Sequence, residues 1–256
     1  MDGGSSGLEG LSASFAQTFT SLVEWALSWW VGGDDPGLGA LRGAVMAIRP
    51  VTSWAVAAAL AVSVVIAGGM LLIRRNGQDL AGLLLGLGRS VLVFSAGWLI
   101  LASCWTLSDA VARWLIGGRP GTAAYAESVM NATNAVDPAL GLTMSIVGIG
   151  CCLSFVAAVL SRFVIAVLLA VVLPVLAAVS VVRADAFGRG LAWLVAVMAF
   201  KPLVAVVYRA CHGLLTTTDD PVVVLLVATL SFLLGAFLLP ATAHVVAGLR
   251  TPLAVR

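Results

Sequence analysis

Residues 51–73 read VTSWAVAAALAVSVVIAGGMLLI, an apolar run without a single charged side chain. A helix needs about 20 mostly apolar residues to cross the hydrocarbon core of a bilayer, so this run predicts a membrane-spanning helix. Comparable runs follow at 80–104, 139–160, 163–183, 191–208 and 222–247. The sequence therefore predicts an all-α, polytopic membrane protein with about six transmembrane helices.

The composition of the chain supports the same class. It is 61% apolar and only 10% charged, whereas soluble domains are about 45–50% apolar and about 25% charged. The longest polar connection, about 110–137, is too short to form a core of its own. We therefore expect most of the surface to face lipid and the chain to lie in the cell membrane.

The N-terminal 50 residues differ from the rest. Residues 1–7 are small and are predicted to be flexible, and 8–50 are predicted to form amphipathic or interfacial helices before a membrane domain over 51–250. Within 8–31 the apolar residues recur every three or four positions, as in an amphipathic helix. They are Leu8, Leu11, Phe15, Leu22, Trp25 and Trp29, with Phe19, Val23 and Trp30 beside them. This helix would lie on the bilayer or bind a partner.

The second run contains small residues and one charge. Gly82 and Gly86 are four residues apart, a spacing that lets two membrane helices approach closely. Arg89 follows, either within the hydrocarbon or reaching to the interface; we favour the interface. Asp109, further on, is predicted to mark the exit from lipid.

Two later runs contain proline, and one of them contains lysine. Pro174 predicts a kink or a gating hinge, because proline frees a backbone carbonyl. Lys201 lies in the middle of an apolar run, where a lysine costs about 2.5–3.5 kcal/mol to insert, and Pro202 is predicted to break the helix there. The segment 191–208 is then a re-entrant or interfacial helix whose lysine reaches the headgroups. Alternatively, Lys201 is a polar point on a translocation path or a subunit contact.

The orientation of the chain follows from its arginines. Six crossings would place both termini on one face, and that face would hold eight arginines against four on the other. Cytoplasmic loops carry the excess of positive charge, so this count favours cytoplasmic termini.

Two common motifs for metal and nucleotide binding are absent from the sequence: there is no HExxH and no P-loop. The four cysteines lie in or beside apolar runs, where a free cysteine acts as a small hydrophobe. We therefore expect no enzyme, no catalytic residue, no cofactor and no metal. Since basic residues do not cluster, nucleic acid is expected only as a translocated substrate.

Four segments together carry a resemblance to a known family. They are RRNGQDLAGLLLGLGRSVLV (74–93), LSDAVARWL (107–115), GRGLAWLVAVMAFKPLVAVVYRA (188–210) and LPATAHVV (239–246). In this order they resemble the TrbL-type polytopic inner-membrane proteins of type IV secretion and conjugative transfer systems, in the version found in high-GC Gram-positive bacteria. The resemblance covers about 40–250 and is most specific between Trp193 and Ala210.

The resemblance implies a structural subunit of a translocation channel for DNA–protein or protein substrates, one that scaffolds or lines the path and supports assembly. Its partners would be other membrane subunits, a cytoplasmic-face ATPase and the lipid bilayer, in a homo- or hetero-oligomer. Three residues of the segment 188–210 match the family by position and would serve packing or assembly: Lys201, Pro202 and Tyr208. In this chain we expect neither the long extracytoplasmic domain nor the polar C-terminal tail of larger members. A small-molecule or ion transporter and a holin-like pore-former are the alternatives.

Overall fold

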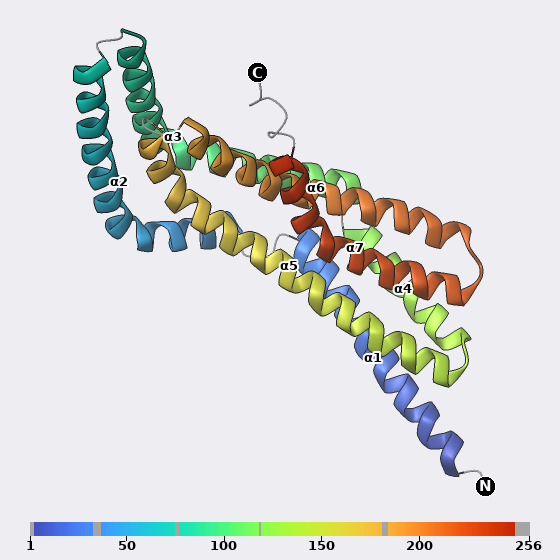
Figure 1. Cartoon of the computed structure of the whole chain (residues 1–256). Helices are drawn as coiled ribbons and strands as arrows, with labels where there is room; N and C mark the ends of the chain where they lie inside the picture. Colours follow the sequence, from blue (N-terminus) through green and yellow to red (C-terminus); the bar gives the residue numbers. More distant parts are fainter. Residues whose placement is uncertain (1–2, 33–36, 75–76, 118, 181–183, 249–256) are drawn as a thin grey trace. The chain divides into compact units, whose positions relative to one another are not determined.

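The computed structural model describes residues 3–32, 37–74, 77–117, 119–180 and 184–248. Within these ranges every regular element is an α-helix (Figure 1). The helices are α1 (Gly3–Gly32), α2 (Leu38–Arg74), α3 (Gly77–Ile116), α4 (Arg119–Ala135), α5 (Pro138–Val179), α6 (Ala184–Thr217) and α7 (Pro221–Gly248). The predicted all-α class is confirmed, and α1 includes part of the 1–7 segment.

The starts of α5 and α7 follow the same local rule. An aspartate precedes a proline at each, and its Oδ1 accepts a bond from a backbone N–H two residues on: Ala139 N to Asp137 at 2.9 Å, and Val222 N to Asp220 at 2.9 Å. Aspartate is a favoured N-cap, and proline suits the first helical position because its missing N–H would have no partner there. These two Asp-Pro pairs fix where the helices begin.

Five of the described helices are long and apolar enough to cross a membrane, so the chain is a multi-pass membrane protein. The expected count of about six is not confirmed. The difference lies in α5, which joins the predicted runs 139–160 and 163–183 into one helix of 42 residues. No glycine or proline lies between the two runs at Ser161-Arg162, so the backbone has no reason to turn.

Prolines inside the helices do not end them. α2 continues through Pro50, α5 through Pro174, α6 through Pro202 and α7 through Pro240. The prediction that Pro202 breaks its helix is therefore wrong. Helix α2 joins the end of the predicted interfacial segment 8–50 to the predicted run 51–73. Figure 1 shows α2 bending along its length, as expected when a proline removes one hydrogen bond of the helix.

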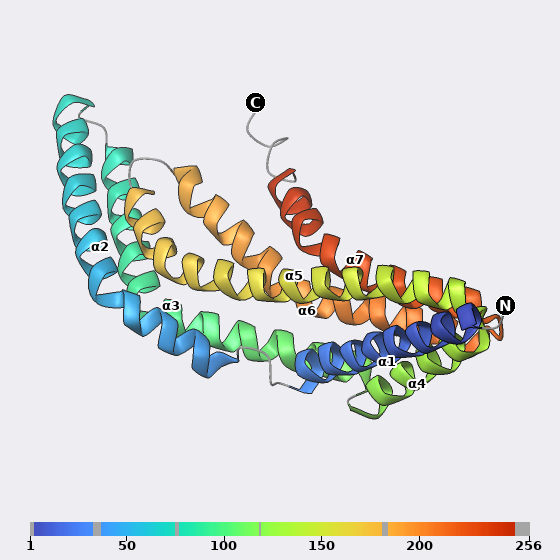
Figure 2. The ribbon, with the colours of Figure 1, turned by 90° about the horizontal axis from the view of Figure 1, so that it is seen from below.

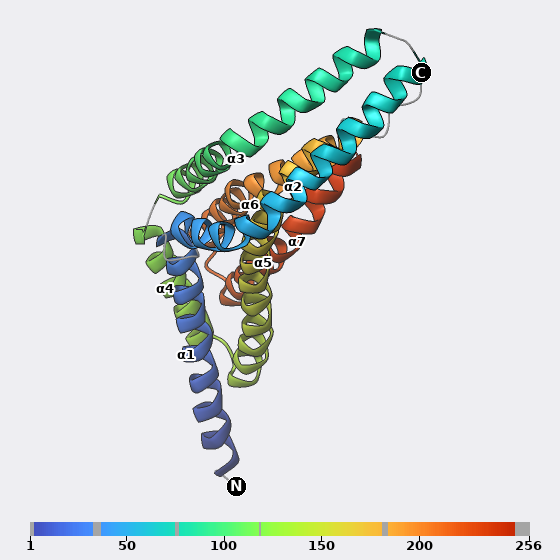
Figure 3. The ribbon, with the colours of Figure 1, turned by 90° about the vertical axis from the view of Figure 1, so that its left-hand side faces the viewer.

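The chain divides into two compact units. Unit 1 contains Met1–Gly37, Ser108–Arg162 and Phe200–Ala241; unit 2 contains Leu38–Leu107, Phe163–Ala199 and Thr242–Arg256. Helices α1 and α4 lie wholly in unit 1, where they pack side by side (Figures 2 and 3). Helix α2 lies wholly in unit 2, beside the part of α3 that belongs to that unit (Figures 1 and 2).

Helix α1 buries a different face from the one that its strongest periodicity predicts. Phe19, Val23 and Trp30 are fully buried, whereas Leu11 and Trp25 are about half exposed. The ring of Phe19 fits against Gly148 of α5, and Trp30 meets Phe155 of α5 edge to face at 5.7 Å. Helix α1 therefore packs inside unit 1 through this face, and its second apolar face remains uncovered by the residues that the structure describes.

Unit 2 has its own apolar core. Leu41 of α2, Leu101 and Trp105 of α3, Val167 of α5 and Val197 of α6 meet there. Many large apolar side chains of the same segments remain exposed, among them Val51, Trp54, Val65, Leu72 and Leu99. An exposed apolar surface of this extent suits contact with lipid.

Candidate functional site

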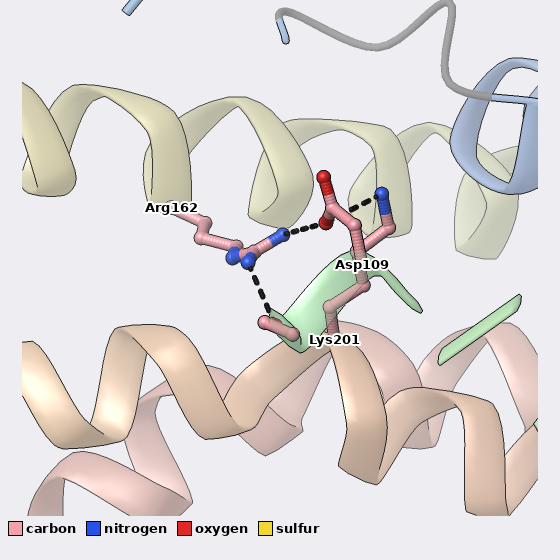
Figure 4. Close-up of polar contacts among 4 residues, drawn as sticks. Asp109, Arg162 and Lys201 are labelled. Atoms are coloured by element: carbon pink, nitrogen blue, oxygen red, sulfur yellow. Dashed lines mark hydrogen bonds and ion pairs between the residues drawn. The ribbon is translucent and has the colours of Figure 1, made fainter. Parts of the chain in front are cut away.

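Three charged side chains from three helices meet inside unit 1 (Figure 4). Nζ of Lys201 on α6 lies 3.0 Å from Oδ1 of Asp109 on α3, and Nη1 of Arg162 on α5 lies 4.0 Å from the same oxygen. The side chains of Lys201 and Arg162 are 3% and 1% exposed, and that of Asp109 is 20% exposed. We call Asp109, Arg162 and Lys201 the charged cluster.

A neighbouring hydroxyl adds to the charged cluster. Nη2 of Arg162 donates to Oγ of Ser108 at 3.2 Å, so α3 contributes one hydroxyl acceptor and, at the next residue, one ion-pair partner to the same guanidinium. Buried charges are costly unless they are paired and hydrogen-bonded. In a candidate membrane span, a carboxylate between two cations fixes three helices relative to one another, and it is also a group that could exchange a proton or an ion.

A second polar cluster in unit 1 is built from aromatic hydroxyls. Tyr125 of α4 lies 2.8 Å from Ser231 of α7 through their hydroxyl oxygens, and its hydroxyl is 3.5 Å from the Ala228 carbonyl. Tyr208 of α6 donates to the Gly121 carbonyl of α4 at 3.0 Å. The two tyrosine rings are 5.0 Å apart. These bonds tie α4 to both α6 and α7.

The environment of Tyr125 affects its ionisation. Tyr125 is completely buried, and burial raises the pKa of its phenol above the usual 10.0. The phenol therefore stays neutral and acts as a hydrogen-bonding group at physiological pH.

The structure brings together two of the residues singled out in the sequence, Asp109 and Lys201. Lys201 is buried and paired, so the expectation that it reaches the headgroups is wrong. Asp109, predicted at the edge of lipid, lies between two cations. Tyr208 holds α6 to α4, Pro202 lies inside α6, and Pro174 lines a cavity in unit 2.

Three other predicted residues cannot be placed in this way. Gly82, Gly86 and Arg89 belong to α3, but their surroundings lie outside the described residues.

Sequence reasoning missed Arg162, Tyr125 and Ser231. Arg162 could have been found, because a charge in a long apolar run is a functional or pairing residue by default. The sequence instead suggests a boundary there between the runs 139–160 and 163–183, either a hairpin or a break in one long helix. Tyr125 and Ser231 carried no such signal, since a tyrosine in a polar segment and a serine in an apolar one are both common.

Among the described residues, no three histidine, cysteine, aspartate or glutamate side chains come together as a metal site. The four cysteines are free thiols. The chain matches no family model, no curated protein and no solved structure.

Proposed function

We propose that this chain is a structural membrane subunit of a translocation complex of the type IV secretion or conjugation kind. It would scaffold or line the path of a DNA–protein or protein substrate and support assembly of the channel. The observation that carries the proposal is that polar side chains of the segment 188–210 bind other helices of the same chain. Lys201 binds Asp109 and Tyr208 binds the Gly121 carbonyl, so both hold one helix of the chain to another.

The position of the charged cluster supports a structural role. Its two cations are almost completely buried and share the Asp109 carboxylate. Polar contacts between membrane helices contribute modestly to stability and define how the helices pack. A subunit that must keep its shape inside a larger assembly needs this kind of internal lock.

The remaining parts of the proposal concern the partners. The sequence has no P-loop, so energy would come from an ATPase at the cytoplasmic face. Other membrane subunits would cover part of the apolar surface that the chain leaves exposed. The complex would lie in the cytoplasmic membrane, and nucleic acid would contact it only as cargo.

The test uses a tagged copy expressed at its native level in the native host. Mild-detergent extraction and mass spectrometry of the co-purifying proteins should identify a secretion ATPase and other transfer proteins. A deletion strain should lose substrate transfer, and the wild-type chain should restore it. A homo-oligomer without such partners, from a strain whose transfer is intact, would overturn the proposal.

The charged cluster also favours a second candidate, a small-molecule or ion transporter. Ionisable residues inside the membrane often line substrate, ion or proton paths. This candidate predicts flux into liposomes that contain the purified chain alone, and loss of that flux in the Asp109→Asn variant. The structural proposal predicts no flux from the chain alone.

A further inference from the structure

Unit 2 contains a cavity of about 350 Å³. Segments of α2, α3, α5 and α6 line it, mostly with apolar side chains that include Leu92, Trp98, Leu173 and Leu194. This volume lies within the roughly 300–1,000 Å³ range of pockets that hold small ligands. The segments of α2 and α3 that line the cavity belong to candidate membrane spans. Lipids of the bilayer are therefore the small amphiphilic molecules that lie next to the cavity.

One wall of the cavity carries a positive charge. Arg49 lines it, exposed, with its guanidinium carbon 5.6 Å from the centre of the Phe94 ring. The other described contact of its side chain is a 3.9 Å hydrogen bond from Nη1 to the Met46 sulfur. Neither contact neutralises the positive charge of Arg49. Within the described residues, no carboxylate pairs with Arg49.

The charge of the surrounding sequence has the same sign. The segments of unit 2 contain nine arginines and two aspartates. Arg42 precedes Arg49 by seven residues on the same helix, which places both on one face of α2. A cationic face beside an apolar cavity is complementary to a ligand with an anionic head and a hydrocarbon tail.

We propose that this cavity is a binding site for one acyl chain of an anionic phospholipid, whose phosphate binds Arg49. A guanidinium is the cation best suited to a phosphate, because its fork of donors can bind two oxygens at once. The preference for an anionic over a zwitterionic lipid comes from the surplus of arginines, each worth about 1 kcal/mol near an anionic surface. The site is independent of the translocation role proposed above.

The experiment uses the full chain in mild detergent, with dioleoylphosphatidylglycerol and dioleoylphosphatidylcholine as probes. Native mass spectrometry measures the retention of each lipid. The wild-type chain should bind the phosphatidylglycerol more tightly than the phosphatidylcholine. Arg49→Gln should weaken the binding of phosphatidylglycerol by about five-fold, the equivalent of about 1 kcal/mol, and should reduce the preference for it by a similar factor. Arg49→Lys should keep most of the binding.

Two further variants make the test specific. Gly97 lines the cavity, and a Cβ built there meets only Val93 at an ordinary 3.6 Å, so Gly97→Leu should fill the space and release both lipids. Arg113→Gln removes an exposed arginine from unit 1 and should leave binding unchanged. Equal retention in the wild type, Arg49→Gln and Gly97→Leu would overturn the site, because it would show annular lipid only. The site would also be overturned if the purified wild-type chain retained no lipid.

Discussion

Lys201 Nζ lies 3.0 Å from Asp109 Oδ1, and the same oxygen is 4.0 Å from Nη1 of Arg162. One carboxylate on α3 therefore serves two buried cations on two other helices. The three residues therefore contribute unequally to stability. Removing the carboxylate affects both cations, whereas removing Lys201 leaves the Asp109–Arg162 pair in place.

The first prediction concerns the difference in stability between variants of Asp109 and of Lys201. Asp109→Asn should lower the free energy of unfolding by about 3–5 kcal/mol, because it leaves two buried cations without their carboxylate. Lys201→Met should remain within about 1 kcal/mol of wild type, because an apolar side chain of similar length replaces a buried ion. Denaturant unfolding in mixed micelles, followed by circular dichroism, measures both.

The matched control for this comparison is Arg209→Gln. Arg209 is an exposed cation on α6, the helix that carries Lys201, and its loss should change stability by less than about 0.5 kcal/mol. If Asp109→Asn unfolded no more easily than this control, the charged cluster would not lock the helices.

The second prediction concerns the hydrogen bond between Tyr125 and Ser231, whose hydroxyl oxygens are 2.8 Å apart. Tyr125→Phe and Ser231→Ala should each cost about 1 kcal/mol, the usual net value of a buried hydrogen bond. The double variant should cost less than the sum of the two, because each single change removes the same bond. Strictly additive losses would mean that α4 and α7 are not coupled here.

The third prediction concerns alkaline pH. The raised pKa of Tyr125 means that, above pH 10.0, the unfolded chain ionises this phenol while the folded chain keeps it neutral. The stabilisation is complete below that pH and is lost as the pH rises further. In the Tyr208→Phe variant Tyr125 is the only tyrosine, so phenolate absorbance should appear together with the loss of helix. Phenolate formation at pH 10 with the helices intact would contradict the burial.

The apolar runs were sufficient to predict the helical membrane class, because a span of about 20 apolar residues has few other structures open to it. They were insufficient to count the helices. The charge at Arg162 suggests a hairpin or a break in one long helix, but the carboxylate of Asp109, distant in sequence, pairs with it inside the protein. Sequence alone does not reveal that partner.

The N-terminal helix shows a different limit. Both of its faces carry large apolar residues, so periodicity identifies a helix but does not choose the buried face. The choice depends on whether a partner surface complements the side chains, and the small Gly148 of α5 receives the Phe19 ring. Complementarity of this kind depends on residues far apart in the chain.

The fourth prediction concerns topology. If α5 crosses the membrane once, residues 137 and 183 lie on opposite faces; two crossings at 139–160 and 163–183 would put them on the same face. Alkaline phosphatase and a fluorescent protein fused after each position should therefore report opposite locations. If the same reporter were active after both positions, the two residues would lie on the same face, and the single crossing of α5 would be wrong.

The fifth prediction uses two glycines on α5 that differ only in what lies beside them. A Cβ at Gly148 would lie 2.5 Å from the Phe19 ring of α1, whereas nothing lies within 4 Å of a Cβ at Gly150. Because Phe19 is fully buried, its ring has little room to move. Gly148→Ala should therefore cost about 1–3 kcal/mol through overpacking, and Gly150→Ala should gain about 0.5–1 kcal/mol from its better helix propensity.

Thermal unfolding of the two alanine variants in the same detergent measures these opposite signs, and limited proteolysis reports on α1 directly. In Gly148→Ala, α1 should be cleaved at a lower protease concentration than in the wild type, because α1 loses its packing contact with α5 at this position. Gly150→Ala should leave the cleavage pattern unchanged. Two variants of equal stability and equal protease resistance would mean that Phe19 does not pack against Gly148.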